Sequence, residues 1–314
     1  MTTLIDDLAA WLNEATEETR ALGPWQVEGP VFRTIKSGIY RATSPAALAP
    51  LALKHYFKGD PASQFEALER TWEIFQNTPH FSAPRPWTLM AAPHPVVAMD
   101  WIEGPTLEDR LHVFKLTGRT LDEPLRQAGL ALNQIHGHSE QGSVHLDTAD
   151  FLNDIKLARE GLEDLPARVA SSVKWLTERA SAAAAPELTT AHLHGDFKPA
   201  NILLGETEIF VIDGLFRGHG PILHDVAQFL NHLSLDLMRP QRLHQLLSRG
   251  TRERAFLTAL TTIRKEEREM PLSWLRILKL TLMEIELAKG PASPRSLYLA
   301  KALHQERARL KSSL

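Results

Sequence analysis

The sequence predicts an α+β protein of two lobes: a small N-terminal lobe with an antiparallel sheet and one main helix, and a larger, mostly helical C-terminal lobe. In the first hundred residues, short runs of β-forming residues alternate with Gly- and Pro-containing turns around one amphipathic helix. After residue 104 the apolar residues recur at helical spacing. A length of 314 residues suits two domains or one large two-lobed domain. We therefore place the lobes at residues 1–103 and 104–314.

The N-terminal segment, residues 1–23, is typical of an acidic amphipathic helix with Thr2 or Thr3 as its N-cap. It lacks the basic start and apolar stretch of an export signal, so we expect a cytoplasmic protein. No apolar run reaches about 18 residues, and we expect no segment that spans a membrane. The chain has no cysteine, which excludes disulfides, thiolate metal sites and thiol catalysis. Its 43% hydrophobic and 23% charged residues describe an ordinary globular protein.

Strands come next in the N-terminal lobe. Residues Val31–Thr43 predict two strands around a turn at Lys36–Gly38, and Leu51–Tyr56 predicts a third. A further strand, Val96–Ile102, ends at Gly104 and Pro105, where the C-terminal lobe begins. These runs account for the expected antiparallel sheet.

The main helix of the N-terminal lobe is predicted over Ser63–Asn77. At 100° per residue, Glu69 lies about 80° from the centre of its apolar stripe and Glu66 about 140°. Glu69 can therefore reach the interior, whereas Glu66 points towards water. The stripe consists of Phe65, Leu68, Trp72 and Phe75.

Helices dominate the remainder of the chain. Helical spacing predicts helices over 106–113, 121–138 and 151–181, and again after Ala227 to the C-terminus. Residues 214–314 carry 17 Lys and Arg against 9 Asp and Glu, although the whole chain has a formal charge of −3. A basic C-terminal part either reflects ordinary variation of helix surfaces or suits an anionic substrate.

The most informative segment runs from Ala191 to Gly214. Its order is His194-Gly195-Asp196, then Asn201, then two short apolar runs joined by a Gly-containing turn, the second ending at Asp213. Two such runs predict a hairpin, which would bring Asp196, Asn201 and Asp213 around one small volume. Oxygen ligands such as Asn201 and Asp213 suit a Mg²⁺ ion that also binds phosphates. Asp196, in the preceding loop, could take a proton from a hydroxyl group. The pattern favours phosphoryl transfer.

The spacing H-x-D-x-x-x-x-N followed by a strand-ending Asp matches the catalytic loop and metal-binding aspartate of protein kinases. HGDFKPAN resembles the H-G-D-x-x-x-x-N signature of the aminoglycoside phosphotransferase and choline kinase group, small-molecule kinases with a protein-kinase-like fold. The resemblance covers about residues 30–230. It implies an ATP- and Mg²⁺-dependent kinase of a small-molecule hydroxyl, with Asp196 as base and Asn201 and Asp213 as metal ligands. Gly214 departs from the aromatic residue usual after this aspartate.

The resemblance also implies residues that hold the nucleotide. The strand Leu51–Lys54 resembles the V-A-I-K strand of kinases, whose lysine binds phosphates. A glutamate of the following helix commonly steers that lysine, and we choose Glu69 for this role, with Glu66 as its rival. Matching the hinge glycine assigns the Asp100 carbonyl and the Ile102 amide to adenine.

Lys198, two residues after the proposed base, resembles the lysine of the D-x-K-P motif in serine/threonine protein kinases and could reach the transferred phosphoryl group. A serine/threonine protein kinase is therefore one alternative. Against it, no G-x-G-x-x-G precedes Lys54, no A-P-E follows Asp213, and Asp225 follows Asp213 by only twelve residues. A kinase of a lipid or lipopolysaccharide sugar is a second alternative. The sequence predicts no nucleic-acid partner and leaves the acceptor and the oligomeric state open.

Overall fold

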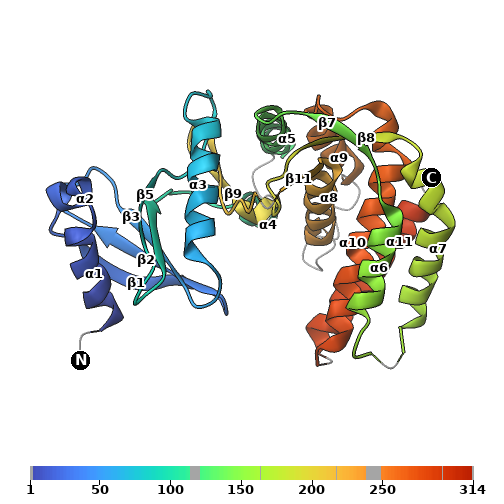
Figure 1. The fold of residues 1–314 in the computed structure, drawn as a ribbon, viewed down its shortest axis with the longest axis horizontal. Helices are drawn as coiled ribbons and strands as arrows, with labels where there is room; N and C mark the ends of the chain where they lie inside the picture. Colours follow the sequence, from blue (N-terminus) through green and yellow to red (C-terminus); the bar gives the residue numbers. More distant parts are fainter. Residues whose placement is uncertain are drawn as a thin grey trace. The chain divides into compact units, whose positions relative to one another are not determined.

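A computed structural model describes residues 3–113, 121–162, 164–216, 218–237, 249–291 and 293–312. The chain forms two compact units (Figure 1). Unit 1 comprises Met1–Pro105 and Ile202–Leu215, and unit 2 comprises Thr106–Asn201 and Phe216–Leu314. Unit 1 thus includes the hairpin after Asn201, which the division at residue 103 assigned to the second lobe. The reason is strand pairing: the second hairpin strand pairs with a two-residue strand at Phe81–Ser82.

Unit 1 contains a five-stranded antiparallel sheet with strand order β1-β2-β3-β6-β5. Its three expected strand regions form strands, and Leu51–Tyr56 does so over the expected residues. The elements are α1 (Leu4–Ala15), α2 (Glu17–Leu22), β1 (Gln26–Arg33), β2 (Ser37–Thr43), β3 (Leu51–Tyr56), α3 (Pro61–Phe75), β4 (Phe81–Ser82), β5 (Pro86–Met90), β6 (Val96–Asp100), β9 (Ile202–Leu204) and β10 (Ile209–Val211).

The helix α1 packs on the sheet by its apolar face. Thr3 caps its start in a reciprocal capping box: the Asp6 amide donates to Thr3 Oγ1, and the Asp6 carboxylate accepts from the Thr3 amide. Leu8 and Leu12 are fully buried against a core that includes Trp25 and Leu53. Burying two leucines contributes roughly 3–6 kcal/mol of transfer free energy before entropy is subtracted. This packing orders the N-terminal segment against the strand that carries Lys54.

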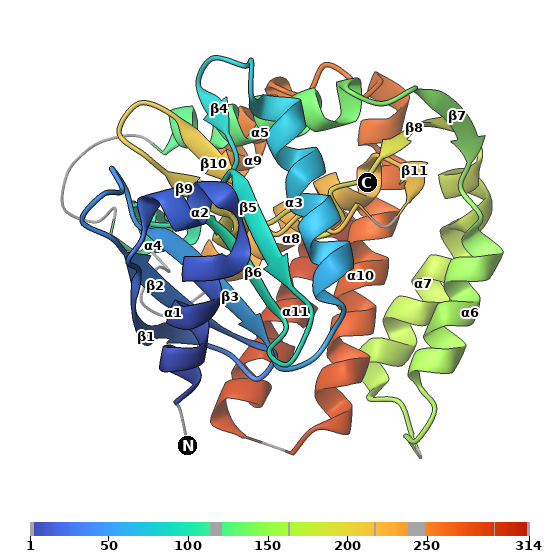
Figure 2. The same cartoon turned by 60° about the vertical axis from the view of Figure 1, so that its left-hand side comes forward.

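Helix α3 runs alongside the sheet (Figures 1 and 2). Asp60 caps it by accepting from the amides of Ala62 and Ser63, and Pro61 supplies its first turn. The buried face consists of Ala67, Thr71, Ile74 and Phe75. This face is rotated from the stripe that the sequence suggested, because small Ala67 and Thr71 lie closest to the sheet while Phe65, Leu68 and Trp72 are only half-buried.

Strands β9 and β10 form the hairpin predicted after Asn201, with Ile202 opposite Val211. Strand β10 also pairs in parallel with β4. Two residues past β10, Asp213 adopts a left-handed backbone with φ of 59°. Only a few per cent of residues other than glycine have this conformation, and aspartate is among those that tolerate it best.

Unit 2 is mostly helical, as expected, with a small antiparallel sheet of order β11-β8-β7. No helix of the described chain is both long and apolar enough to cross a membrane. The elements are α4 (Leu107–Val113), α5 (Asp122–Gly137), β7 (Gly142–His145), α6 (Thr148–Ala158), α7 (Ala167–Ala184), β8 (Glu187–His192), η1 (Pro199–Asn201), β11 (His219–Pro221), α8 (Leu223–Leu237), α9 (Arg249–Thr258), η3 (Lys265–Arg268), α10 (Met270–Lys289) and α11 (Pro294–Ser312).

Helix α10 is the centre of unit 2 and packs against α7, α8 and α11 (Figure 2). Its buried Arg276 is paired with Glu253 and Glu306, at 3.0 Å each. Arg276 and Asn231 of α8 are also joined by two hydrogen bonds of 3.0 and 3.1 Å. Because a buried charge is costly unless it is paired, this network sets the register of α8 against α10. Helix α8 carries side chains of the candidate site.

Candidate active site

The loop after β8 is held by a buried carboxylate. Asp225, at the start of α8, is 1% exposed and accepts from the backbone amides of His194 at 2.8 Å and Gly195 at 2.9 Å. His136, the penultimate residue of α5, donates Nε2–H to the same carboxylate at 3.1 Å. Burial alone would raise the pKa of Asp225, but His136, His194 and the Gly195 amide lower it, and the net pKa is below the ordinary value. The loop geometry is therefore built around an ionised Asp225.

Asp196 follows directly, and three side chains donate to its carboxylate. Lys198 Nζ lies 2.5 Å from Oδ2, Asn201 Nδ2 lies 3.0 Å from the same oxygen, and Gln228 Nε2 lies 2.7 Å from Oδ1. The Asp196 side chain is 26% exposed. Both oxygens are thus oriented while the group stays accessible to a substrate. A carboxylate in this setting can accept a proton from a hydroxyl group.

Asn201, in the turn η1, is held by the same residue. Its Nδ2 donates to the Asp196 backbone carbonyl at 2.9 Å as well as to the side chain. With the amide nitrogen committed to Asp196, the side-chain oxygen is the atom left for a cation. The structure therefore brings Asp196, Lys198 and Asn201 together within unit 2.

Two further polar residues singled out in the sequence, Lys54 and Asp213, lie together in unit 1. Lys54 Nζ lies 2.5 Å from Asp213 Oδ1, although 159 residues separate them in the chain. Burial lowers the pKa of Lys54, but the charge of Asp213 and the contact with Tyr56 outweigh burial and leave the pKa above its ordinary value. The Lys54 side chain is 11% exposed, whereas that of Asp213 is 42% exposed. Lys54 is thus a permanently charged group, and Asp213 keeps oxygen surface available for a cation.

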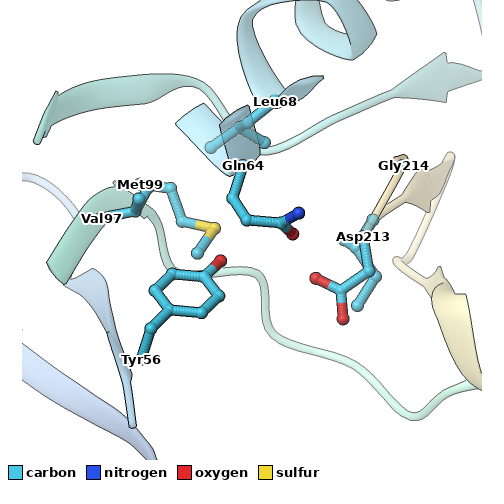
Figure 3. Close-up of a pocket in the computed structure, with 8 residues that line it drawn as sticks. Tyr56, Gln64, Leu68, Val97, Met99, Asp213 and Gly214 are labelled. Atoms are coloured by element: carbon cyan, nitrogen blue, oxygen red, sulfur yellow. The ribbon is translucent and has the colours of Figure 1, made fainter. Parts of the chain in front are cut away.

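A pocket lies beside this ion pair and encloses about 330 Å³, part of it open to solvent (Figure 3). Gln64 of α3 points its amide into the space between Tyr56 and Asp213. The remaining wall is apolar apart from the backbone at Gly214. The lining residues are Tyr56, Gln64, Leu68, Val97, Met99, Ile212, Asp213 and Gly214.

The expected pairing of Lys54 with Glu69, or with its rival Glu66, does not occur in this structure. Both glutamates are exposed, and the ion pair of Lys54 is with Asp213. The cause is the rotated burial of α3. At 100° per residue, Glu69 lies roughly opposite the centre of the buried face, so its carboxylate faces solvent. Gln64 occupies the pocket side of the helix instead.

The two hinge residues lie where β6 leaves the sheet. Asp100 is the last residue of β6, and its side chain accepts from the Trp87 indole at 2.7 Å and from the Arg85 amide at 3.2 Å. The Trp101 amide binds the Pro50 carbonyl at 3.2 Å, and Ile102 follows outside the strand. The Asp100 side chain thus anchors the end of the strand, and the adenine contact of its backbone and of Ile102 remains a prediction.

Sequence reasoning missed four residues of these sites. Gln228 lies three residues beyond Asp225, and helical spacing from that aspartate is the only signal for it. For His136, the pairing with Asp225 depends on a contact 89 residues away. Gln64 and Tyr56 carry no motif, since neither belongs to a charged pair that a spacing rule would select.

A comparison with protein families identifies the family of this chain. Residues 37–257 match the model of the phosphotransferase enzyme family, APH. The chain therefore belongs to this phosphotransferase family and is a kinase. A search of curated proteins found no match.

Solved structures agree on the fold. The chain is similar to a choline/ethanolamine kinase family protein from Mesorhizobium loti, with a TM-score of 0.65 and 16% identity over 99% of this chain and 94% of that one. Choline kinase LicA from Streptococcus pneumoniae matches with a TM-score of 0.57 and 13% identity over 92% and 94%. A spectinomycin phosphotransferase, solved with ADP and spectinomycin, matches with 0.54 and 13% over 97% and 95%. At these identities the similarity establishes the protein-kinase-like fold of small-molecule kinases.

Proposed function

We propose that this chain transfers the γ-phosphoryl group of ATP to a hydroxyl group of a small molecule, with Asp196 as the general base. One observation carries the proposal: the Asp196 carboxylate is half-accessible and oriented by Lys198, Asn201 and Gln228. In the reaction, Asp196 takes the hydroxyl proton and the acceptor oxygen bonds to the γ-phosphorus. The bond between the γ-phosphorus and the bridging oxygen breaks, and ADP leaves. Catalysis then depends mainly on positioning and charge stabilisation.

Lys54 supplies the cation for the nucleotide phosphates in this proposal. Its raised pKa keeps it charged, and Asp213 holds the ammonium group in place. Lys198 lies beside the base and would neutralise charge that develops during the transfer. The ADP bound to the spectinomycin phosphotransferase of similar fold supports an adenine nucleotide as donor.

The donor atoms also fit a magnesium ion. Asn201 has its amide nitrogen committed to Asp196, and Asp213 has an accessible carboxylate. When bound, Mg²⁺ would neutralise phosphate charge. Asn201 and Asp213 are the residues that would hold it. Both offer hard oxygen atoms.

An ATP-consumption screen tests the proposal. Purified protein is offered ATP and Mg²⁺ with sugars, amino alcohols, nucleosides and aminoglycosides, and Asp196→Asn is assayed in parallel. We expect at least one class to give acceptor-dependent ADP formation that the variant loses. Turnover that persists in the variant, or no acceptor-dependent turnover in any class, contradicts the proposal.

A further inference from the structure

Helix α8 presents a row of polar side chains next to Asp196. His224, Gln228 and His232 are four residues apart, so they lie above one another on one face of the helix. Gln228 donates to Asp196 at 2.7 Å, which fixes this face as the one turned to the proposed base. His224 packs against the ring of Phe151 with centroids 5.2 Å apart. The two histidines are half-buried on either side of the residue that contacts the base.

Lys279 of α10 joins this row. Arg276, three residues earlier, is hydrogen-bonded to Asn231 of α8, so Lys279 follows one turn further along the packed interface. Its charge acts on both His224 and His232 and is itself acted on by Asp225 and Asp196. The side chain is half-buried. Lys279 therefore lies on the side of α10 that faces α8, within electrostatic reach of the base.

Both acidic neighbours of Lys279 already have other close partners. Asp225 accepts from His136 and two backbone amides, and Asp196 accepts from Lys198, Asn201 and Gln228. In the described part of the chain, the side chains of Lys279, His224 and His232 form no hydrogen bond or ion pair. A half-buried cation without a partner is costly, and ionisable groups with perturbed pKa values cluster at functional sites.

Burial lowers the pKa values of all three members of this cluster. Burial, reinforced by Lys279, lowers the pKa of His224 to about 4. Burial is also the main reason that the pKa values of His232 and Lys279 fall below their ordinary values. The acidic groups that act on His232 are Asp196 and Glu108 of α4. An anion at this place would stabilise the charged form of every member of the cluster.

We infer that the acceptor of this kinase is a small hydroxylated anion, bearing a carboxylate or a phosphate that Lys279 binds with His224 and His232 beside Asp196. The identification of the anion as the acceptor rests on the proposed function, whereas the anion site itself does not. In this inference, selectivity for anionic acceptors comes from the side chains near Asp196 and not from the overall basic charge of residues 214–314. Cationic acceptors would place a positive charge next to Lys279 and be disfavoured.

A matched set of three-carbon probes tests the site. Glycerate and glycerol 3-phosphate carry the anionic groups, glycerol is neutral, and 3-amino-1,2-propanediol is cationic. Binding to the full chain is measured by calorimetry at about 0.15 M ionic strength, where attraction beyond about 8 Å is screened. We expect at least one anionic probe to bind more tightly than the neutral and cationic probes. Its preference between carboxylate and phosphate identifies the group recognised.

Variants then locate the binding. Lys279→Met should weaken binding of the anionic probe by roughly 10–100-fold, because one charge-assisted contact is lost. Lys279→Arg should restore much of the affinity, and Lys156→Met, at an exposed lysine of α6, should leave it unchanged. Circular dichroism confirms that each variant is folded. If neither anion binds preferentially, or if Lys279→Met binds like the wild type, the inference is overturned.

Phosphorylation is scored separately with the same probes and the acceptors of the ATP screen. Anion binding that depends on Lys279, without any acceptor-dependent ADP formation, would contradict the proposed kinase reaction and leave the anion site standing. Efficient phosphorylation of cationic acceptors without anion binding would contradict the anion site and support the proposed kinase reaction. The two failures are therefore distinguishable.

Discussion

The two signature aspartates, one in each unit, are held in different ways. Asp196 of unit 2 accepts from three side chains, and the loop before it is fixed by the buried Asp225. Asp213 of unit 1 lies after a short strand in a left-handed backbone conformation, is 42% exposed, and is bound by Lys54. Asp213 is therefore the more exposed of the two carboxylates.

This difference suits the two chemical tasks that we propose for these aspartates. A base must meet a hydroxyl group at a defined distance, so its oxygens gain from being oriented before the substrate arrives. A metal ligand gains from accessible oxygen, since the cation itself completes the geometry. Lys54 can hold Asp213 in the meantime, because an ion pair prevents an uncompensated charge in a half-buried place. The following predictions test this contrast, beginning with the largest effect.

Asp196→Asn should lower kcat by roughly 10²–10⁴-fold, because the carboxamide cannot accept the proton. The KM for ATP should stay nearly constant, since the nucleotide groups of unit 1 are untouched. Steady-state kinetics on the identified acceptor measure both values. Asp154→Asn, at an exposed position of α6, is the matched control and should behave as the wild type. Near wild-type turnover in Asp196→Asn would exclude this residue as the base.

Asp225→Ala should destabilise the protein by about 3–5 kcal/mol, since His136 and two backbone amides lose a buried ionic partner. Urea unfolding measures the loss, with Asp154→Ala as control. The pKa of Asp225 is lowered by folding, so its contribution is complete above the unfolded value of about 3.9 and is lost as pH falls through the folded value. The acid limb of the stability curve should therefore flatten in the variant. An unchanged limb would show that Asp225 does not support the loop as an ion.

Asp213→Ala should weaken Mg²⁺-dependent nucleotide binding by at least about 10–100-fold, the range seen even for groups that only support a metal ligand. Asn201→Ala removes a neutral ligand and should weaken it less. The same variant also frees Asp196 from one donor, so it should lower kcat as well. Calorimetric titration of ATP with and without Mg²⁺ gives the order. A reversed order, or binding that ignores Mg²⁺, would remove Asp213 from the metal site.

Gln64→Ala should raise the KM for ATP about 2–12-fold, the value of one hydrogen bond in the pocket beside Lys54 and Asp213. Glu69→Gln and Glu66→Gln serve as controls on the same helix and should stay within about twofold, because both side chains are exposed. A large effect of Glu69→Gln together with a silent Gln64→Ala would restore the pairing that the sequence suggested.

The proximity of Asp196, Lys198 and Asn201 was predictable because it depends on short-range order. Asp196, Lys198 and Asn201 lie within six residues, so one turn of chain places them together whatever surrounds them. The hairpin after Asn201 and the strand Leu51–Tyr56 were equally local, since alternating apolar runs and glycine turns specify strands directly. These elements carried the family resemblance and the class of reaction.

The face of α3 was not predictable in the same way. A helix with Phe65, Leu68 and Trp72 has an obvious apolar stripe, yet the sheet buries Ala67, Thr71 and Ile74. Which face of a helix is buried depends on how all the side chains at the interface pack together, and the apolar pattern of the helix alone does not fix it. Hydrophobic periodicity does not reveal this rotation of the helix. Because of the rotation, Gln64 and not Glu69 lies at the pocket.

By itself, then, the sequence determined the α+β class, the order of the elements, and the loop that holds Asp196 and Asn201, because propensity, turns and spacing act over a few residues. Only the tertiary structure decided which distant partners complete these groups: Asp213 for Lys54, Gln228 for Asp196, His136 for Asp225, and Lys279 beside the row on α8. Those pairs depend on the rotation and register of packed helices and strands. Rotation and register are set by the volume and polarity of all the side chains at an interface at once.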